Sequence, residues 1–103
     1  MKLVVFHRDA EAELRAAVAY YEQQRRGLGL DFQAEVERAV GRIQEHPQLF
    51  PHHDVTLGLR RCIVRRFPYT IFYVELDDSI WIAAVAHHRR RPGYWASRTP
   101  ERN

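Results

Sequence analysis

The chain has 103 residues, of which 46% are hydrophobic and 28% are charged, and its formal net charge is +3. This length predicts a single domain over residues 1–103 that can bury a core without metal or disulfide help, and the lone cysteine, Cys62, excludes an internal disulfide framework. No segment resembles a signal peptide, and no apolar run is long enough to cross a bilayer, so we expect a cytoplasmic protein with no membrane partner.

The first predicted element is a short strand over residues 2–6, where apolar and β-branched side chains follow one another. A helix is predicted over residues 10–26, because apolar side chains recur there at helical spacing, namely Leu14, Ala17, Val18 and Tyr21. Asp9 is expected to cap its start, since a carboxylate can accept hydrogen bonds from the free amides of the first turn. Gly27 and Gly29 are expected to end this helix.

A second helix is predicted over residues 30–46. Its apolar face consists of Phe32, Val36, Ala39, Val40 and Ile43. Pro47 is expected to end it, because the residue before a proline avoids the helical conformation. Only about three residues link the two helices, so we expect them to pack as an antiparallel hairpin.

The C-terminal half predicts strands, because after a loop the hydrophobic period changes to two. The loop covers residues 48–58, and the strands cover residues 59–67, 69–75 and 80–88. Asp77 and Asp78 are expected to form a tight turn between the last two strands. The last strand is expected to place Ile80, Ile82, Ala84 and Ala86 on one face, where the small alanines leave room for helices.

The predicted element order is therefore β-α-α-β-β-β, which indicates an α+β domain. The helical hairpin is expected to cover one face of a small antiparallel sheet. A polar C-terminal tail over residues 92–103 follows, and we expect it to be loose or to carry a short helix.

The basic residues are unevenly distributed along the chain. Residues 1–51 carry 7 Lys or Arg and 8 Asp or Glu, whereas residues 52–103 carry 9 and 5, and all nine bases there are arginine. Guanidinium groups suit phosphates and carboxylates, so we expect an acidic partner or a nucleic acid to face this half. The side chains assigned to this polyanion binding are Arg60, Arg61, Arg65, Arg66, Arg89, Arg90, Arg91, Tyr94 and Trp95.

Each of the two basic clusters has a second interpretation. The arginines of residues 60–66 either bind a polyanion or form a solvated edge that blocks sheet pairing. In the run from His87 to Trp95, His87 or His88 either moves a proton near neutral pH or belongs to an ordinary polar strand end. No Cys or carboxylate stands at ligand spacing beside the histidine pairs, and no phosphate-binding glycine loop occurs, so we expect neither metal nor cofactor.

Several short motifs in order resemble the RelE/ParE toxin superfamily over nearly the whole chain. The first half carries Ala-Tyr-Tyr-Glu at 19–22, Gly-Leu-Gly at 27–29, and His46-Pro47. The second half carries Leu59-Arg60-Arg61, Phe67-Pro68-Tyr69 and Phe72-Tyr73, followed by residues 86–90 and by Tyr94-Trp95. The resemblance implies the toxin of a bacterial type II toxin–antitoxin module, which a cognate antitoxin protein neutralises and which meets operator DNA only through that antitoxin.

The superfamily divides by target, and the resemblance implies two possible activities. ParE-like members inhibit DNA gyrase, whereas RelE-like members cleave mRNA on the ribosome without metal, using basic residues and often a C-terminal tyrosine. Arg61 and Tyr94 match the RelE-like pattern, but Ile63 and Thr70 stand where RelE has basic residues. The sequence therefore favours a gyrase inhibitor that is not an enzyme. The alternative is a metal-independent endoribonuclease, with Arg61, Arg65, His87, His88 and Tyr94 as the candidate catalytic residues.

The resemblance also implies where an antitoxin binds. In this superfamily an extended, often acidic antitoxin segment covers the helices or the sheet of the toxin. The residues assigned to antitoxin binding are Leu14, Val18, Tyr21, Arg61 and Arg65.

Overall fold

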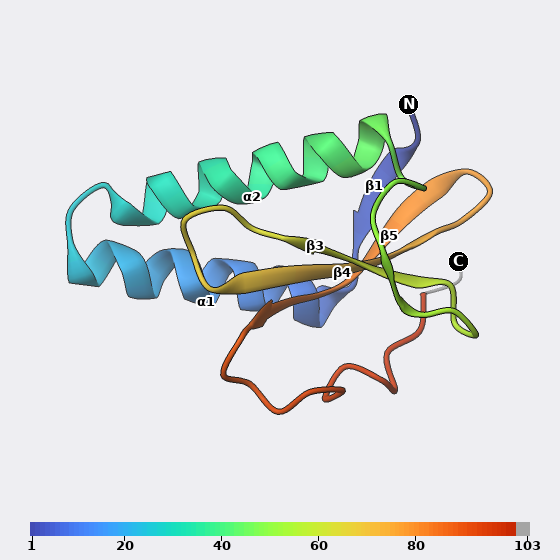
Figure 1. The fold of residues 1–103 in the computed structure, drawn as a ribbon. Coiled ribbons are helices and arrows are strands. Elements are labelled where there is room, and N and C mark those ends of the chain that lie inside the picture. Colours follow the sequence, from blue (N-terminus) through green and yellow to red (C-terminus); the bar gives the residue numbers. More distant parts are fainter. Residues whose placement is uncertain (101–103) are drawn as a thin grey trace.

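A computed structural model describes residues 1–100 of the chain (Figure 1). The elements are β1 Leu3–Phe6, α1 Arg8–Gln24, α2 Leu28–Glu45, β2 His52–Asp54, β3 Leu59–Ile63, β4 Tyr69–Glu75 and β5 Ser79–His87. The α+β fold, with a helical hairpin on one face of a sheet, is confirmed. One short strand, β2, lies within the segment that was predicted to be a loop. No helix among residues 1–100 is long and apolar enough to span a membrane.

The sheet has five strands in the order β1-β5-β4-β3-β2. Neighbouring strands from β2 to β5 are antiparallel, but β1 is parallel to β5, with Val4 opposite Ile80. The sheet is therefore mixed, and the prediction of a purely antiparallel sheet was wrong in this respect. Two parallel strands need a long connection between them. Here the chain segment from α1 to β4 connects β1 to β5.

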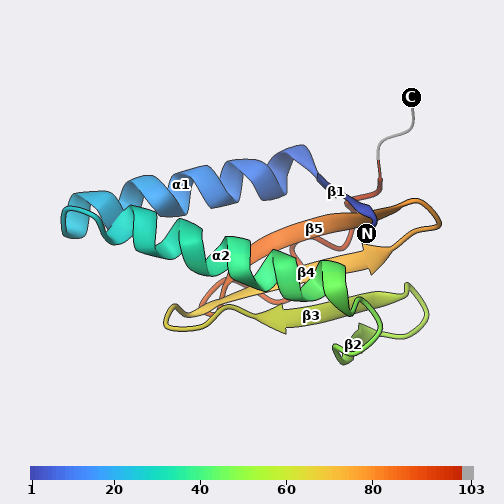
Figure 2. The ribbon, with the colours of Figure 1, turned by 90° about the horizontal axis from the view of Figure 1, so that it is seen from above.

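The two helices lie side by side on one face of the sheet (Figure 2). Helix α1 begins at Arg8 rather than at residue 10, because the His7 imidazole accepts a hydrogen bond from the Asp9 amide and takes the capping role expected of Asp9. Gly27, with a φ of 87°, forms the link between the helices. Gly29 does not end α1 but lies inside α2, where a Cβ atom would stand 2.5 Å from the Val18 carbonyl oxygen. It permits close packing of the helices.

The main core lies between the helices and the sheet. Its fully buried members include Phe32, Val36 and Ile43 from α2 and Ile71 and Tyr73 from β4. Tyr21, Phe67 and Tyr69 pack around Phe32 with ring centroids 4.8–5.2 Å apart, which adds edge-to-face contacts to the apolar burial. The Cys62 thiol is buried at the same interface, and this burial raises its pKa.

A β-bulge in β5 changes which side chains face the helices. Phe72 pairs with Ala84 and Tyr73 with Ile82, so Ala83 is an extra residue without a partner on β4. An inserted residue reverses the alternation of faces along a strand. Ile80 and Ile82 therefore belong to the main core, as does Val85, whereas Ala84 and Ala86 lie in the second core on the opposite face. The prediction that Ile80, Ile82, Ala84 and Ala86 share one face was wrong for this reason.

Two further boundaries differ from the predictions. Strand β3 ends at Ile63 rather than at residue 67, and residues 64–68 form a bend in which Arg66 has a positive φ of 72°. The C-terminal tail forms turns over residues 92–97 rather than a helix, and it crosses the face opposite the helices (Figure 1). Residues 101–103 of the predicted tail lie outside the described residues.

Candidate functional site

The face of the sheet opposite the helices has an apolar layer of its own. Trp95 of the C-terminal tail stacks on Phe72 of β4, with ring centroids 4.1 Å apart and planes 23° apart. This second core consists of Leu59, Phe72, Trp81, Ala83, Ala84, Ala86 and Trp95, each of which is buried. The face of the sheet opposite the helices is therefore mainly hydrophobic.

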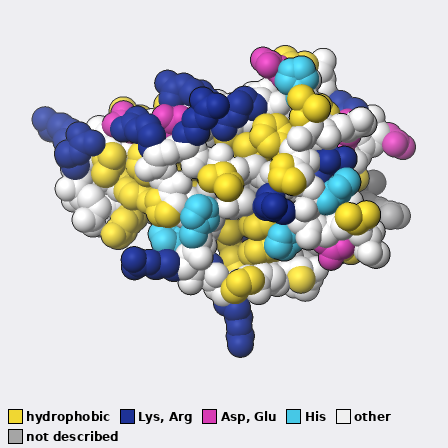
Figure 3. Space-filling model, in the orientation of Figure 1, with side chains coloured by type: hydrophobic (Ala, Val, Ile, Leu, Met, Phe, Trp, Pro, Cys, Tyr) yellow, Lys and Arg dark blue, Asp and Glu magenta, His cyan; other side chains and the backbone are white. Residues whose placement is uncertain are grey.

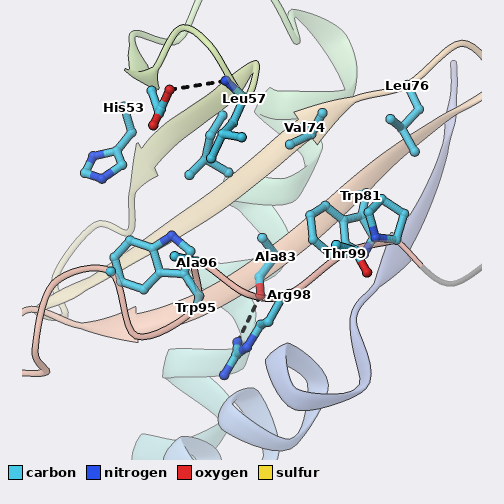
Figure 4. Close-up of a pocket in the computed structure, with 14 residues that line it drawn as sticks. His53, Leu57, Val74, Leu76, Trp81, Ala83, Trp95, Ala96, Arg98 and Thr99 are labelled. Carbon is cyan, nitrogen blue, oxygen red and sulfur yellow. Dashed lines mark hydrogen bonds between the residues drawn. The ribbon is translucent and has the colours of Figure 1, made fainter.

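The tail does not cover this face completely, and an apolar groove of about 450 Å³ remains (Figure 4). Its walls come from the loop after β2, from β4 and β5, and from the tail. The labelled side chains that face it include Leu57, Val74, Leu76, Trp81 and Trp95. Leu57 is 57% exposed, although it is a large hydrophobic residue. An exposed apolar concavity of this kind is typical of a binding surface for another protein.

The groove continues toward the edge of the sheet. A smaller hollow beside it shares Leu76 and Trp81 with the groove and adds Leu3 and Val5 of β1. These two β1 residues are 70% and 44% exposed. The apolar surface therefore extends from the loop after β2 to the opposite edge strand.

A polar cluster on α1 fastens the tail, and we call it the Glu13 clamp; it consists of Glu13, Tyr94, Arg98 and the backbone amide of Val85. The Glu13 carboxylate accepts hydrogen bonds from the Tyr94 hydroxyl at 2.6 Å, from the Arg98 guanidinium at 2.9 and 3.1 Å, and from the Val85 amide at 3.0 Å. Arg98 also donates to the Ala83 carbonyl at 2.9 Å (Figure 4). The Arg98 and Glu13 side chains are only 12% and 13% exposed, so the pair is well shielded from water.

The arginines of the first basic cluster mostly hold neighbouring segments. Arg60 donates to the carbonyls of Gln48 and Phe50, at 3.2 and 2.7 Å, and Arg61 donates to the His52 carbonyl at 2.8 Å. Arg60 therefore attaches the loop before β2 to the sheet, and Arg61 adds a contact between β3 and β2.

The other two arginines of this cluster follow β3. The Arg66 guanidinium lies 3.8 Å from the Asp31 carboxylate and 3.6 Å from the Glu35 carboxylate, both on α2. Arg65 is exposed. Arg66 is therefore directed to the helical side of the sheet, away from the groove.

The second basic cluster forms an exposed turn after β5. The Arg90 guanidinium lies 3.9 Å from the centre of the Tyr94 ring. The His87 Nδ1 atom accepts a hydrogen bond from the Arg89 amide, and burial lowers the pKa of His87, with further lowering from Arg89 and His88. His88 and Thr70 share a hydrogen bond of 2.9 Å.

The predicted site residues are thus not all brought together. In Figure 3 the dark-blue side chains gather mainly along the upper left, over α2, and elsewhere they are scattered among hydrophobic side chains and histidines. Trp95, assigned to polyanion binding, is buried in the second core. Leu14, Val18 and Tyr21, assigned to antitoxin binding, are partly buried where they pack against the main core. Among residues 1–100, no three His, Cys, Asp or Glu side chains are close enough to hold a metal ion.

Sequence reasoning missed the groove and the Glu13 clamp. One signal for the groove was available, because the run from Ile80 to Ala86 is apolar at every position. Such a run is typical of a strand that is covered on both faces. The clamp had no comparable signal, since Glu13 and Arg98 are separated by 85 positions.

Comparison with known proteins adds a family and a fold. The family model of the ParE toxin of the type II toxin–antitoxin system parDE matches residues 4–92. A solved structure of a chromosomal ParDE TA system from P. aeruginosa contains a chain of similar fold, with a TM-score of 0.66 and 17% sequence identity. The match covers 84% of this chain and 96% of that one. The search of curated proteins gave no match.

Proposed function

Because this chain belongs to the ParE toxin family of type II toxin–antitoxin systems, we propose that it is a toxin that a cognate antitoxin neutralises and that acts by inhibiting DNA gyrase. In this proposal the toxin works by binding a protein target and not by cleaving RNA.

The apolar groove supports the antitoxin part of the proposal. A folded protein rarely leaves Leu57, Val74 and Leu76 around one open concavity unless another protein covers it. An antitoxin segment with one apolar face would bury these side chains, and the surface released from water would favour binding. Arg61, which was assigned to antitoxin binding, instead donates to the His52 carbonyl and does not line the groove.

The hydrogen bond and burial of the Tyr94 hydroxyl are the observation that favours gyrase over mRNA as the target. A metal-free ribonuclease needs acid and base groups that are free to reach the reacting phosphate and ribose. The Tyr94 hydroxyl already donates to the Glu13 carboxylate, and burial together with this hydrogen bond raises the pKa of Tyr94. A phenol that is held in this way is poorly suited to proton transfer, which favours a toxin that acts by binding.

The test is induction of the toxin without its antitoxin, followed by separate measurements of DNA damage and mRNA integrity. We expect DNA breaks, intact mRNA, and inhibition of purified gyrase in a supercoiling assay. Co-expression of the antitoxin encoded beside the toxin gene should restore growth. If gyrase supercoiling and cleavage remain unchanged at saturating toxin, the gyrase proposal is wrong.

The ribonuclease alternative has one observation in its favour. A hollow of about 200 Å³ near the end of β5 is lined by three histidines, His53, His87 and His88, together with Arg90. Imidazoles beside a guanidinium are suitable groups for cleaving a phosphodiester. Translation arrest with cuts within codons, lost in a His87→Ala/His88→Ala double variant, would establish this alternative and overturn the proposal above.

A further inference from the structure

Strand β3 has an open edge beyond the short strand β2 (Figure 2). Strand β2 pairs with β3 only at Leu59 and Arg60, and the Arg61 amide then donates a hydrogen bond to the Pro51 carbonyl. Past that point, no strand within residues 1–100 pairs with β3 on this side. A hollow of about 360 Å³ lies along the uncovered edge, and we call it the β3-edge hollow.

Three arginines from different parts of the fold line the β3-edge hollow. Arg42 belongs to the last turn of α2, Arg61 to β3, and Arg65 to the bend after β3. The other lining residues are Phe50, Pro51, Cys62 and Ile63. The lining contains no carboxylate, so three positive charges border one hollow without a negative charge among them.

The three guanidinium groups are also not neutralised from elsewhere in the chain. Within residues 1–100, none of them forms an ion pair with a carboxylate. Arg42 is half-buried, and its contact with the Cys62 sulfur is long, at 4.0 Å. Arg61 donates to the His52 carbonyl, and Arg65 is exposed. Since a guanidinium has several N–H donors, most of the donors around the hollow remain available to a ligand.

The edge of β3 adds a backbone donor to this set. Successive amides of a strand point to opposite sides of it. The Arg61 amide bonds to the Pro51 carbonyl at the open edge, whereas the Val64 amide bonds to the Tyr69 carbonyl on the β4 side. The Ile63 amide therefore points to the open edge, toward the hollow that it lines. Backbone amides beside guanidinium groups are a common means of holding oxyanions.

The Cys62 thiol indicates that two of the charges act on the same point. Burial raises the pKa of Cys62, and the charges of Arg42 and Arg65 oppose this rise. The two guanidinium groups therefore lie close enough to the floor of the hollow to favour a negative charge there.

The shape and the donors of the hollow favour a phosphate compound. A guanidinium fork matches the oxygens of a phosphate group, and several forks around one hollow suit a ligand with several negative charges. The volume lies within the range of small-molecule sites, about 300–1,000 Å³. Ile63 is 60% exposed, and with Phe50 and Pro51 it forms an apolar wall beside the arginines. A nucleic acid would need a longer basic track along successive phosphates.

We propose that the β3-edge hollow binds a small molecule that carries a diphosphate or triphosphate group, such as a nucleotide. Arg42, Arg61 and Arg65 hold the phosphate oxygens, and the apolar wall lies against the rest of the ligand. This inference depends on neither gyrase inhibition nor RNA cleavage.

The test is calorimetric titration of the purified full chain with pyrophosphate and, separately, with ADP. We expect saturable binding of both, which weakens as salt rises. Affinity should fall about tenfold in Arg42→Gln and in Arg65→Gln, because each change removes charge-assisted hydrogen bonds. Equal affinity for the two ligands would assign recognition to the phosphates alone, whereas tighter binding of ADP would add a contribution from the apolar wall.

Arg26→Gln is the matched control variant. It removes the same charge from the link between the helices, at the opposite end of α2 from Arg42, and Arg26 is exposed. It should bind both ligands like the unaltered chain, and thermal unfolding checks that all three variants fold. Alkylation of the Cys62 thiol gives a second readout, because a ligand that binds the folded chain should slow it. This slowing should be absent in Arg65→Gln.

Three outcomes would overturn the inference. The first is equal binding of pyrophosphate by the hollow variants and by Arg26→Gln. The second is citrate that binds as tightly as pyrophosphate, because the site would then not select phosphate. The third is a single-stranded RNA that binds more tightly than ADP and is lost in Arg42→Gln. Each result leaves the gyrase assay unaffected, so it is distinguishable from a failure of the proposed function.

Discussion

The two faces of the sheet bury similar side chains under very different covers. On one face, α1 and α2 provide a continuous layer, with Phe32 fully buried beneath it. On the other, a short tail held by Trp95 and the Glu13 clamp covers only part of the apolar surface and leaves the groove open. The helical face therefore serves mainly stability, whereas the tail face leaves apolar surface open, which in our proposal a partner protein covers.

The strongest test of this contrast is Phe32→Ala, on the helical face. Loss of a fully buried ring from an aromatic cluster should lower the free energy of unfolding by about 3–5 kcal/mol, a large part of the total for a domain of this size. Chemical denaturation measures the loss, and faster alkylation of the buried Cys62 gives a second readout. Leu30→Ala, an exposed change on the same helix, should cost no more than about 0.5 kcal/mol. Equal losses from the two variants would contradict the assignment of Phe32 to the core.

The second test is Glu13→Gln, which removes the carboxylate that holds the C-terminal tail on the other face of the sheet. The Arg98 guanidinium would keep its bond to the Ala83 carbonyl but lose its counter-charge in a shielded site, which should cost about 3 kcal/mol. Limited proteolysis should then cut within residues 92–100, where the unaltered chain resists. Glu11→Gln is the matched control, because the exposed Glu11–Arg15 pair on the same helix should contribute less than about 1 kcal/mol.

The third test separates stability from partner binding. Leu57→Asp places a charge in the groove at an exposed position, so the free energy of unfolding should change by no more than about 0.5 kcal/mol. The affinity for the cognate antitoxin should fall about tenfold, because the charge would lose water when the groove is covered. Calorimetric titration measures this effect. Leu30→Asp, at a position on α2 that is also exposed, should bind normally, and a similar loss there would place the antitoxin on the helices instead.

The smallest expected effect is a pH dependence from His87, at the boundary between the two faces. Burial lowers the pKa of His87 below its ordinary value of 6.5, so the unfolded chain binds more protons than the folded chain between the two pKa values. The contribution of His87 to stability is therefore complete above pH 6.5 and is lost as the pH falls through the folded pKa. Unfolding curves between about pH 5 and 8 should show a weaker pH dependence in His87→Gln. An unchanged dependence would assign the effect to other groups.

Much of the helical face could be predicted from the sequence, because periodicity reports directly on burial. The spacing of Leu14, Ala17, Val18 and Tyr21 placed α1 correctly against the sheet. The start of that helix was missed because His7 caps it, and an imidazole is not among the usual capping side chains. Gly29 was misjudged because the sequence does not distinguish a glycine that ends a helix from one that permits close packing.

The tail face could be predicted only in part. The bulge at Ala83 has no marker in the sequence, yet it moves Ala84 and Ala86 to the opposite face. The arginines of β3 and the following bend were assigned to polyanion binding, but Arg60 and Arg61 bond to backbone carbonyls of the preceding loop and of β2, respectively. Composition and spacing do not distinguish an arginine that bonds to backbone atoms of its own chain from an arginine that is free to bind a ligand.

The parallel pairing of β1 with β5 has a consequence for synthesis of the protein. Leu3 of β1 pairs with Ser79 of β5, so β1 has no partner strand until β5 has left the ribosome. Contacts between such distant residues form late and slowly. A chain that is released early lacks β5, on which both β1 and the tail depend, and so cannot assemble either face of the sheet. We therefore expect that only chains in which β5 has been made can fold, and that an antitoxin made at the same time has an interval in which to meet them.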